Sequence, residues 1–132
     1  MSAPSLVFDD KERVGAWVAD QVEQTSSWGD FYAMGAEANG EIVSGVVLNN
    51  FNEANSTCHI AVSIPNGLFL ELLDHAYSYA FGQCGLKRLT GLVAADNHKA
   101  LKLDKHIGFV EEGVMTKAGR QGQDIITLVL WP

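Results

Sequence analysis

Two side-chain types of chemical interest gather where an apolar run meets a predicted helix. Asn97 follows the run at residues 88–95 and stands at the start of that helix. Lys99, Lys102 and Lys105, three of the nine basic residues of the chain, lie on the helix itself. Backbone N–H groups at a helix N-terminus attract anions, and lysine adds a point charge that suits phosphate. This pattern indicates a place for an anionic ligand, although ordinary solubilising surface charge also explains the lysines.

His59 is the second candidate for chemistry. It lies in "STCHIAVSI", residues 56–64, where alternation places it on the face opposite Ile60 and Val62. An imidazole has an ordinary pKa of about 6.5, so it can accept a proton near neutral pH. Two interpretations stay open here, a general base and a half-buried histidine that hydrogen-bonds to a neighbouring strand.

Charge is distributed unevenly along the 132 residues. The net charge of −7 argues against general nucleic-acid binding. Residues 1–86 carry two basic and eleven acidic side chains, whereas residues 87–132 carry seven basic and five acidic ones. An anionic ligand is therefore expected at the C-terminal third. The acidic N-terminal part favours a cationic partner by charge complementarity.

Length and composition predict one domain over residues 1–132, with enough apolar residues, 47%, to form a core. No apolar run approaches the ~20 residues of a membrane helix, and the acidic N-terminus does not resemble a signal peptide. We therefore expect a cytoplasmic protein without membrane contact. Cys58 and Cys84 have no metal-ligand spacing, so no metal is expected.

Apolar periodicity and turn residues predict the element order β-α-β-β-β-α-β-α-β-β. The expected strands cover 5–8, 31–38, 41–51, 56–64, 88–95, 109–116 and 124–131. Three helices are expected: one capped by Asp9 or Asp10 that runs to about 23, one from 68 to 85, and one capped by Asp96 or Asn97 that runs to about 106. Asn39-Gly40 predicts a type I′ hairpin turn, and the strand at 88–95 is expected to be buried. The fold class is α/β (α+β), a mixed sheet of six to seven strands flanked by helices.

The strands at 54–64 and 88–95 are joined by a helix, so we expect them to be parallel. The run "YAFGQCGLKRLTGLVAADNHKALKLDKHIGFVEEGV" and the closing "GQDIITLVL" resemble the GNAT superfamily of acyl-CoA-dependent N-acyltransferases. The resemblance covers residues 58–130, and the part before it matches by topology alone. Small phage-associated GNAT-like proteins look most similar.

This resemblance implies a splay between the fourth and fifth strands that binds acetyl-CoA as co-substrate. Backbone around Ile60, Val62 and Ile64 would pair with the pantetheine amides. The N–H groups of Asn66, Gly67 and Leu68 would hold the pyrophosphate. Asn97 would contact the cofactor or the reacting amide, and Lys99 and Lys102 would meet its phosphates.

The family often uses a Glu on the central strand and a Tyr on the last helix, and this last helix has no Tyr. The resemblance makes His59 the first candidate base. Glu111, with its neighbour Glu112, is a second candidate or part of a solvated strand face. Trp28, in the "TSSWGD" loop, is either an acceptor-binding residue or a hydrophobic plug.

The sequence departs from the family at the phosphate loop, because only "NGLF" follows Pro65. The expected function is acetyl transfer from acetyl-CoA to a primary amine of a small molecule or protein, and the acidic N-terminal part favours a cationic acceptor. The alternative is a GNAT-shaped binding or assembly module with little affinity for acetyl-CoA. The apolar last strand could also pair across a homodimer.

Overall fold

The computed structural model describes residues 4–24, 26–65 and 71–132, and over these the predicted order of elements is confirmed. The strands are β1 (Ser5–Val7), β2 (Phe31–Ala38), β3 (Glu41–Asn52), β4 (Thr57–Ser63), β5 (Arg88–Ala94), β6 (Val110–Met115) and β7 (Ile125–Leu130). The helices are α1 (Lys11–Gln21), α2 (Glu71–Tyr77) and α3 (His98–His106). The described strands form one mixed sheet in the order β1-β2-β3-β4-β5-β7-β6, which confirms the predicted fold class.

A tight hairpin joins β2 to β3. Asn39 and Gly40 have φ angles of 54° and 80°, the left-handed values that both central residues of a type I′ turn require. The two strands pair antiparallel along their length after this turn. The Asn-Gly dipeptide therefore predicted this connection correctly.

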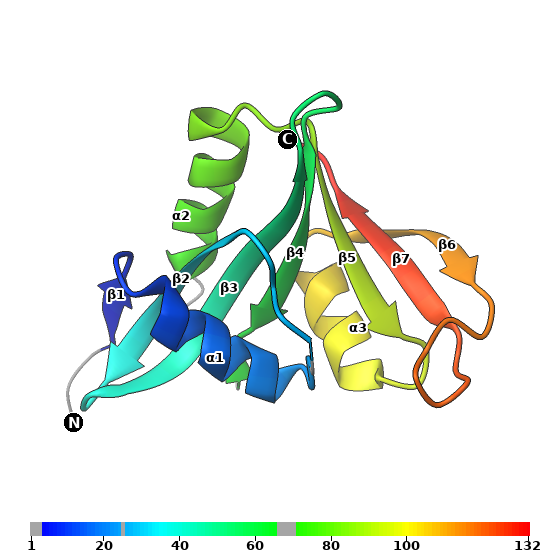
Figure 1. Ribbon diagram of the computed structural model, residues 1–132, viewed down its shortest axis with the longest axis horizontal. Coiled ribbons are helices and arrows are strands. Elements are labelled where there is room, and N and C mark those ends of the chain that lie inside the picture. Colours follow the sequence, from blue (N-terminus) through cyan, green and yellow to red (C-terminus); the bar gives the residue numbers. More distant parts are fainter. Residues whose placement is uncertain (1–3, 25, 66–70) are drawn as a thin grey trace.

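The helices cover opposite faces of the sheet (Figure 1). Helix α1 packs on β2 and β3, where its Val14 and Val18 are fully buried. Helices α2 and α3 lie on the other face, where Leu72 of α2 is buried in a core that Leu101 of α3 packs against. Because side chains alternate along a strand, each face supplies its own apolar core.

The start of α1 differs in one detail from the expectation. Asp10 occupies the N-cap position, but its side chain makes no capping hydrogen bond. Its carboxylate instead lies 3.6 Å from the guanidinium of Arg13. The position of the helix was predicted correctly, whereas the capping role of the aspartate was wrong.

Helix α2 continues into a π-helical segment, Ser78–Gln83, which the sequence did not indicate. The N–H of Cys84 donates to the carbonyl of Tyr79 at 2.8 Å. Gly85 then ends the helix with a φ of 65°, as expected from its freedom to adopt left-handed backbone. The predicted pyrophosphate residues Asn66, Gly67 and Leu68 precede α2 and lie outside the described residues.

Strands β4 and β5 are parallel, as predicted, but they pair over only three positions. The last pair is His59 with Thr90. Beyond it, β4 remains paired with β3, and β5 remains paired with β7. The two halves of the sheet therefore diverge and leave a wedge between β4 and β5 (Figure 1).

Two expectations about the C-terminal strands are wrong. Strand β5 is not fully buried, because Leu92 is 46% exposed on the face opposite α3. Strand β7 pairs on one side with β5 and on the other with β6, so it offers no free edge for pairing across a homodimer. The free edge at this end of the described sheet belongs to β6. No helix in the described ranges is long and apolar enough to cross a bilayer.

Helix α1 approaches the sheet closely because β3 carries a glycine beneath it. A Cβ on Gly45 would lie 2.5 Å from Cγ2 of Val18. We therefore predict that Gly45→Ala forces α1 away from β3 and lowers the free energy of unfolding by about 1–3 kcal/mol, measured by urea denaturation. Gly113→Ala is the control, because nothing lies within 4 Å of its Cβ position, and it should change stability by less than about 0.5 kcal/mol. Equal stability of the two variants would contradict this packing.

Candidate functional site

A cavity of 360 Å³ opens where β4 and β5 diverge. The two strands supply its facing walls, and residues from both faces of the sheet complete it. It is lined by Val22, Glu23, Gln24, Trp28, Asn49, Asn50, His59, Ile60, Ala61, Val62, Thr90, Gly91, Leu92, Val93, Ala94, Asn97, Ala100, Asp104 and Phe109. The predicted residues His59, Ile60, Val62, Asn97 and Trp28 therefore meet around one space.

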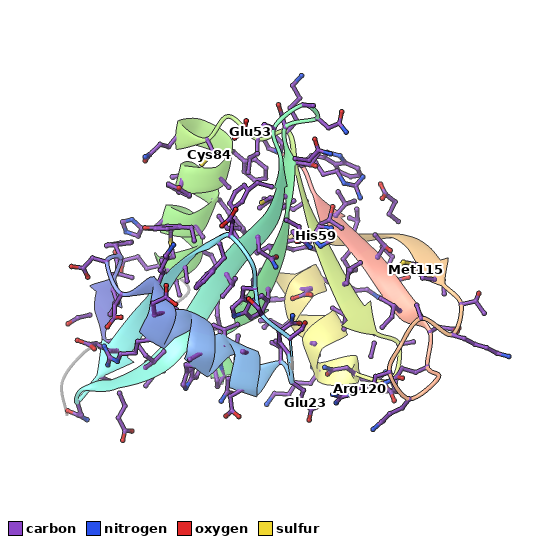
Figure 2. The ribbon with its side chains drawn as sticks, viewed as in Figure 1. Glu23, Glu53, His59, Cys84, Met115 and Arg120 are labelled. Carbon is purple, nitrogen blue, oxygen red and sulfur yellow. The ribbon has the colours of Figure 1, made fainter. Side chains whose placement is uncertain are left out.

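His59 lies at the narrow end of this cavity, in the last paired position of β4 (Figure 2). The ring is half-buried, and burial lowers its pKa, with a further lowering by the positive charge of Arg88. Its Nδ1 lies 3.2 Å from the side-chain amide of Asn50, a hydrogen bond whose direction depends on the ring tautomer. The lowered pKa keeps the imidazole neutral at pH 7 and able to accept a proton.

Asn97 lies after β5, at the cavity wall next to α3. Its Oδ1 accepts a hydrogen bond of 3.1 Å from the backbone N–H of Ala100, so Asn97 is the N-cap of α3. Of the two predicted caps, Asp96 and Asn97, the structure selects Asn97. Because the oxygen serves the helix, the two N–H donors of the side-chain amide remain for a ligand.

The backbone edges that face each other across the cavity belong to β4 and β5. Ile60 and Val62 line the cavity, whereas the side chain of Ile64 is buried in the core beneath it. Past Thr90 neither strand pairs with the other. Peptide groups on these two inner edges can therefore hydrogen-bond to an extended ligand, as they would in an added strand.

The wall on the side of α1 is built by the end of that helix and the loop after it. The ring Nε1–H of Trp28 donates to the carbonyl of Gly15 at 2.9 Å, and the side chain of Asn49 donates to the carbonyl of Trp28 at 3.2 Å. These bonds fix a half-buried indole against the cavity. Glu23 lies close by at the end of α1 and lines the same space (Figure 2).

Lys99 and Lys102 are exposed on α3 and do not line the cavity. Neither forms an ion pair with any residue in the described ranges. Lys105, on the same helix, is neutralised by Glu111 at 2.7 Å. Lys99 lies in the first turn of α3, which Asn97 caps, and Lys102 lies about one turn further along the helix.

The structure does not bring Glu111 to the cavity. Glu111 lies on β6, which β5 and β7 separate from β4 in the sheet order. It is exposed and paired with Lys105, and its neighbour Glu112 accepts a 2.8 Å hydrogen bond from Arg88. The second candidate base is therefore not at the cavity, because β7 inserts between β5 and β6.

Asp104 is a site residue that the sequence analysis missed. It lies on α3, its side chain is half-buried, and it lines the cavity. Burial raises the pKa of this carboxyl to about 7. Asp104 follows Ala100 by four residues and Asn97 by seven, which places the three on one helical face, but spacing alone does not reveal desolvation.

Among the described residues, no group of three or more His, Cys, Asp or Glu side chains could hold a metal ion. The polar groups around the cavity are instead suited to binding an amide-containing ligand and to moving protons. Asn97 supplies N–H donors. The two titratable groups lie on opposite faces of the sheet, because His59 pairs with Thr90 whereas Asp104 faces Gly91, the next residue of β5.

Solved acetyltransferases share this fold. A dodecameric structure of spermidine N-acetyltransferase from Vibrio cholerae matches with a TM-score of 0.73 and 19% identity, over 99% of this chain and 95% of that one. The Vibrio cholerae spermidine/spermine N-acetyltransferase in complex with manganese ions matches with 0.73 and 19%, over 98% and 92%. A structure described as a probable acetyltransferase matches with 0.67 and 22%, over 92% and 80%.

No family model and no curated protein matches this sequence. At these identities, the structural likeness shows the fold, which is the GNAT fold that the sequence resemblance implied. The similarity to phage-associated proteins is not addressed by these structures and stays a prediction.

The raised pKa of Asp104 makes a prediction about stability. Between about pH 4 and pH 7 the folded state keeps a proton that the unfolded chain has lost, so stability falls as pH rises through this range. Asp104→Asn cannot ionise and avoids that loss. Its Tm should equal that of the wild type at about pH 4 and exceed it by about 4 °C or more at about pH 8, measured by calorimetry.

Asp96→Asn is the control for this experiment, because it removes an exposed carboxylate from the turn before α3. We expect the Tm of Asp96→Asn to differ from that of the wild type by the same amount at every pH. A Tm difference between Asp104→Asn and the wild type that is constant from acid to alkaline pH would contradict burial of the Asp104 carboxyl.

Proposed function

We propose that this protein is an N-acetyltransferase that moves an acetyl group from acetyl-CoA to a primary amine. The observation that carries the proposal is the divergence of β4 and β5 after three paired positions, with a 360 Å³ cavity between them. A slot with unpaired peptide edges on both sides suits an extended, amide-containing thioester arm. The acetyltransferases that share the fold support the same reaction class.

The cofactor would enter from the side of α2 and α3. Peptide groups of Ile60 and Val62 would pair with the pantetheine amides, and the free N–H groups of Asn97 would bind the arm or the reacting carbonyl. Lys99 and Lys102, unpaired with any described residue, would offset the charge of the cofactor phosphates. The pyrophosphate role of Asn66, Gly67 and Leu68 stays a prediction.

His59 is the proposed general base. Attack on a thioester requires a neutral amine, and a neutral imidazole beside the cavity can take the proton that the amine loses. For Nε2 to act, Nδ1 must carry the ring proton, and the side-chain oxygen of Asn50 must then accept it. A rotation of the Asn50 amide supplies this arrangement at the 3.2 Å contact.

The acceptor would approach from the side of α1. The cavity-lining residues include the carboxylates of Glu23 and Asp104 but no lysine or arginine, so a cationic amine is favoured. The fixed indole of Trp28 and the carboxylate of Glu23 both line this space, and an aromatic face can bind such a cation. The names of two neighbours mention spermidine, and we propose a polyamine as the acceptor class to try first.

The second candidate is a binding or assembly module with the GNAT fold and little affinity for acetyl-CoA. The observation that favours it is the sequence "NGLF" after Pro65, which contains no basic residue and departs from the phosphate loop of the family that the sequence resembles. A single helix N-terminus attracts an exposed anion by only about 0.3–1 kcal/mol. Acetyl-CoA binding therefore separates the two candidates.

Gly91 allows a test of the site that does not depend on catalysis. A Cβ there would meet Asp104, the carbonyl of Ile60 and Leu128 at 3.9 Å each, so Gly91→Ala fits and Gly91→Leu fills the gap. We predict that acetyl-CoA at 100 times its Kd stabilises the wild type and Gly91→Ala by up to about 2.7 kcal/mol and stabilises Gly91→Leu far less. Thermal melts with and without acetyl-CoA measure this difference.

Two outcomes of these melts would count against the proposal. No stabilisation of the wild type at roughly millimolar acetyl-CoA would favour the binding module. Equal stabilisation of Gly91→Ala and Gly91→Leu would place the ligand outside the gap between the strands.

His59→Gln tests the proposed base. We predict a loss of thiol release from acetyl-CoA of about 10²–10⁴-fold with spermidine as acceptor, because the amine proton has no acceptor. The stabilisation by acetyl-CoA should remain. His75→Gln is the control, since His75 is exposed on α2 and absent from the cavity wall. Turnover of His59→Gln at the rate of His75→Gln would remove His59 from the mechanism.

A further inference from the structure

Asp104 is a carboxyl group on the cavity wall that the proposed chemistry above does not use. No described residue donates a hydrogen bond to its side chain or forms an ion pair with it. Its helix is held independently of this group, by the Asn97 cap and by contact of Leu101 and Ile107 with the core. The Asp104 carboxyl is therefore not needed to hold α3 in place.

The carboxyl lies at the point where the two strands separate. Its Oδ2 is 3.9 Å from the position of a Cβ on Gly91, and the carbonyl oxygen of Ile60 is also 3.9 Å from that position. Gly91 and Ile60 are the first residues after the last strand pair, His59 with Thr90. With only hydrogen on Gly91, the space between Asp104 and the edge of β4 stays open.

Asp104 and His59 reach the cavity from opposite faces of the sheet. Gly91, which faces Asp104, follows Thr90, which pairs with His59, and successive residues of a strand point to opposite faces. His59 therefore lies on the side of α1, where the acceptor would enter. Asp104 lies on the side of α2 and α3, where the cofactor would enter.

The groups around Asp104 leave it without a neutralising cation. Tyr77 of α2 donates its hydroxyl to the carbonyl of Ile107 at 3.1 Å, and its pKa is raised by burial and by the charges of Asp104 and Asp74. The other titratable groups of the cavity wall are His59 on β4 and Glu23 after α1. Lys105, the next residue of α3, is paired with Glu111. Desolvation therefore dominates, and it favours the protonated carboxyl near neutral pH.

We propose that the Asp104 carboxyl is the general acid that protonates the sulfur of the thiolate leaving group. This inference rests on the proposed acetyl transfer and adds the residue that completes it. A carboxyl on the cofactor side of the gap, facing the edge of β4 where the thioester arm would lie, is placed to reach that sulfur.

The step balances without any further reactant. The amine nitrogen attacks the thioester carbonyl carbon, so that a C–N bond forms and the C–S bond breaks, with its electron pair moving to sulfur. The amine proton passes to His59, and the Asp104 proton passes to sulfur. The products are the amide, the free thiol, an imidazolium and a carboxylate. His59 then releases its extra proton to solvent, and Asp104 takes up a proton from solvent, so both groups regain their starting states.

The test varies the leaving group. An alkyl thiolate such as that of CoA needs a proton as it leaves, whereas the thiolate of S-(4-nitrophenyl) thioacetate leaves without one. We expect Asp104→Asn to lose about 10²–10³-fold in kcat with acetyl-CoA and to lose little with the aryl thioester. His59→Gln is the matched control, because the base is needed with either donor, and it should lose rate with both. Thermal melts of Asp104→Asn with acetyl-CoA should retain the wild-type shift.

The pH profile is the second readout. The ionisation of the acceptor amine affects the wild-type and Asp104→Asn rates equally, so it does not affect the ratio of the two rates. This ratio should fall as pH rises through about 7, because wild-type Asp104 then loses its proton. A carboxyl that served only to hold α3 in place would leave the ratio independent of pH.

Three results would overturn the proposal. Loss of rate by Asp104→Asn that is equal with the two thioesters would assign the residue to positioning, and no loss with acetyl-CoA would remove it from the reaction. A wild-type protein that neither binds acetyl-CoA in melts nor releases thiol would overturn the proposed function itself, and the role of Asp104 with it. The wild-type melt and the variant kinetics therefore distinguish the two failures.

Discussion

The cavity depends on a parallel strand contact that stops after three residues. Beyond the pair of His59 and Thr90, β4 is held only by β3, and β5 only by β7. Each strand keeps a full ladder on its outer edge, so the inner edges can separate without unfolding either half of the sheet. Buried peptide groups require partners, and the inner edges can take theirs from a ligand. The missing pairing between β4 and β5 therefore leaves peptide groups that can bind a ligand.

Desolvation in this cavity acts on an acid and a base in opposite directions. It lowers the pKa of His59 and raises that of Asp104 to about 7, because in both cases burial disfavours the charged form. A neutral imidazole and a protonated carboxyl can therefore coexist near neutral pH. They lie on opposite faces of the sheet, which separates the proton acceptor from the proton donor and keeps them from neutralising each other.

The charged residues in and around the cavity follow the same division. Glu23 stands on the side of α1, while Lys99 and Lys102 stand on α3 without partners among the described residues. An acceptor cation and an anionic cofactor would thus meet opposite fields as they approach. The exposed Leu92 of β5 lines the cavity on the side of α1, whereas the free edge of β6 lies at the far end of the sheet order.

The sequence by itself determined what depends on neighbours along the chain. Helix and strand periods, the Asn39-Gly40 turn and a cap at Asp96 or Asn97 each involve residues within about four positions, and the crossover rule then made β4 and β5 parallel. Together with the family resemblance, these elements led to the candidates His59, Ile60, Val62 and Asn97, and all four line the cavity.

Only the tertiary structure decided what depends on the order of strands and on burial. The insertion of β7 beside β5 moved Glu111 to the far edge of the sheet and removed the expected dimer edge. The packing of α3 over Gly91 made Asp104 a desolvated group facing the gap. Solvent exclusion is a property of all the elements that surround a side chain, so no local pattern of residues reports it.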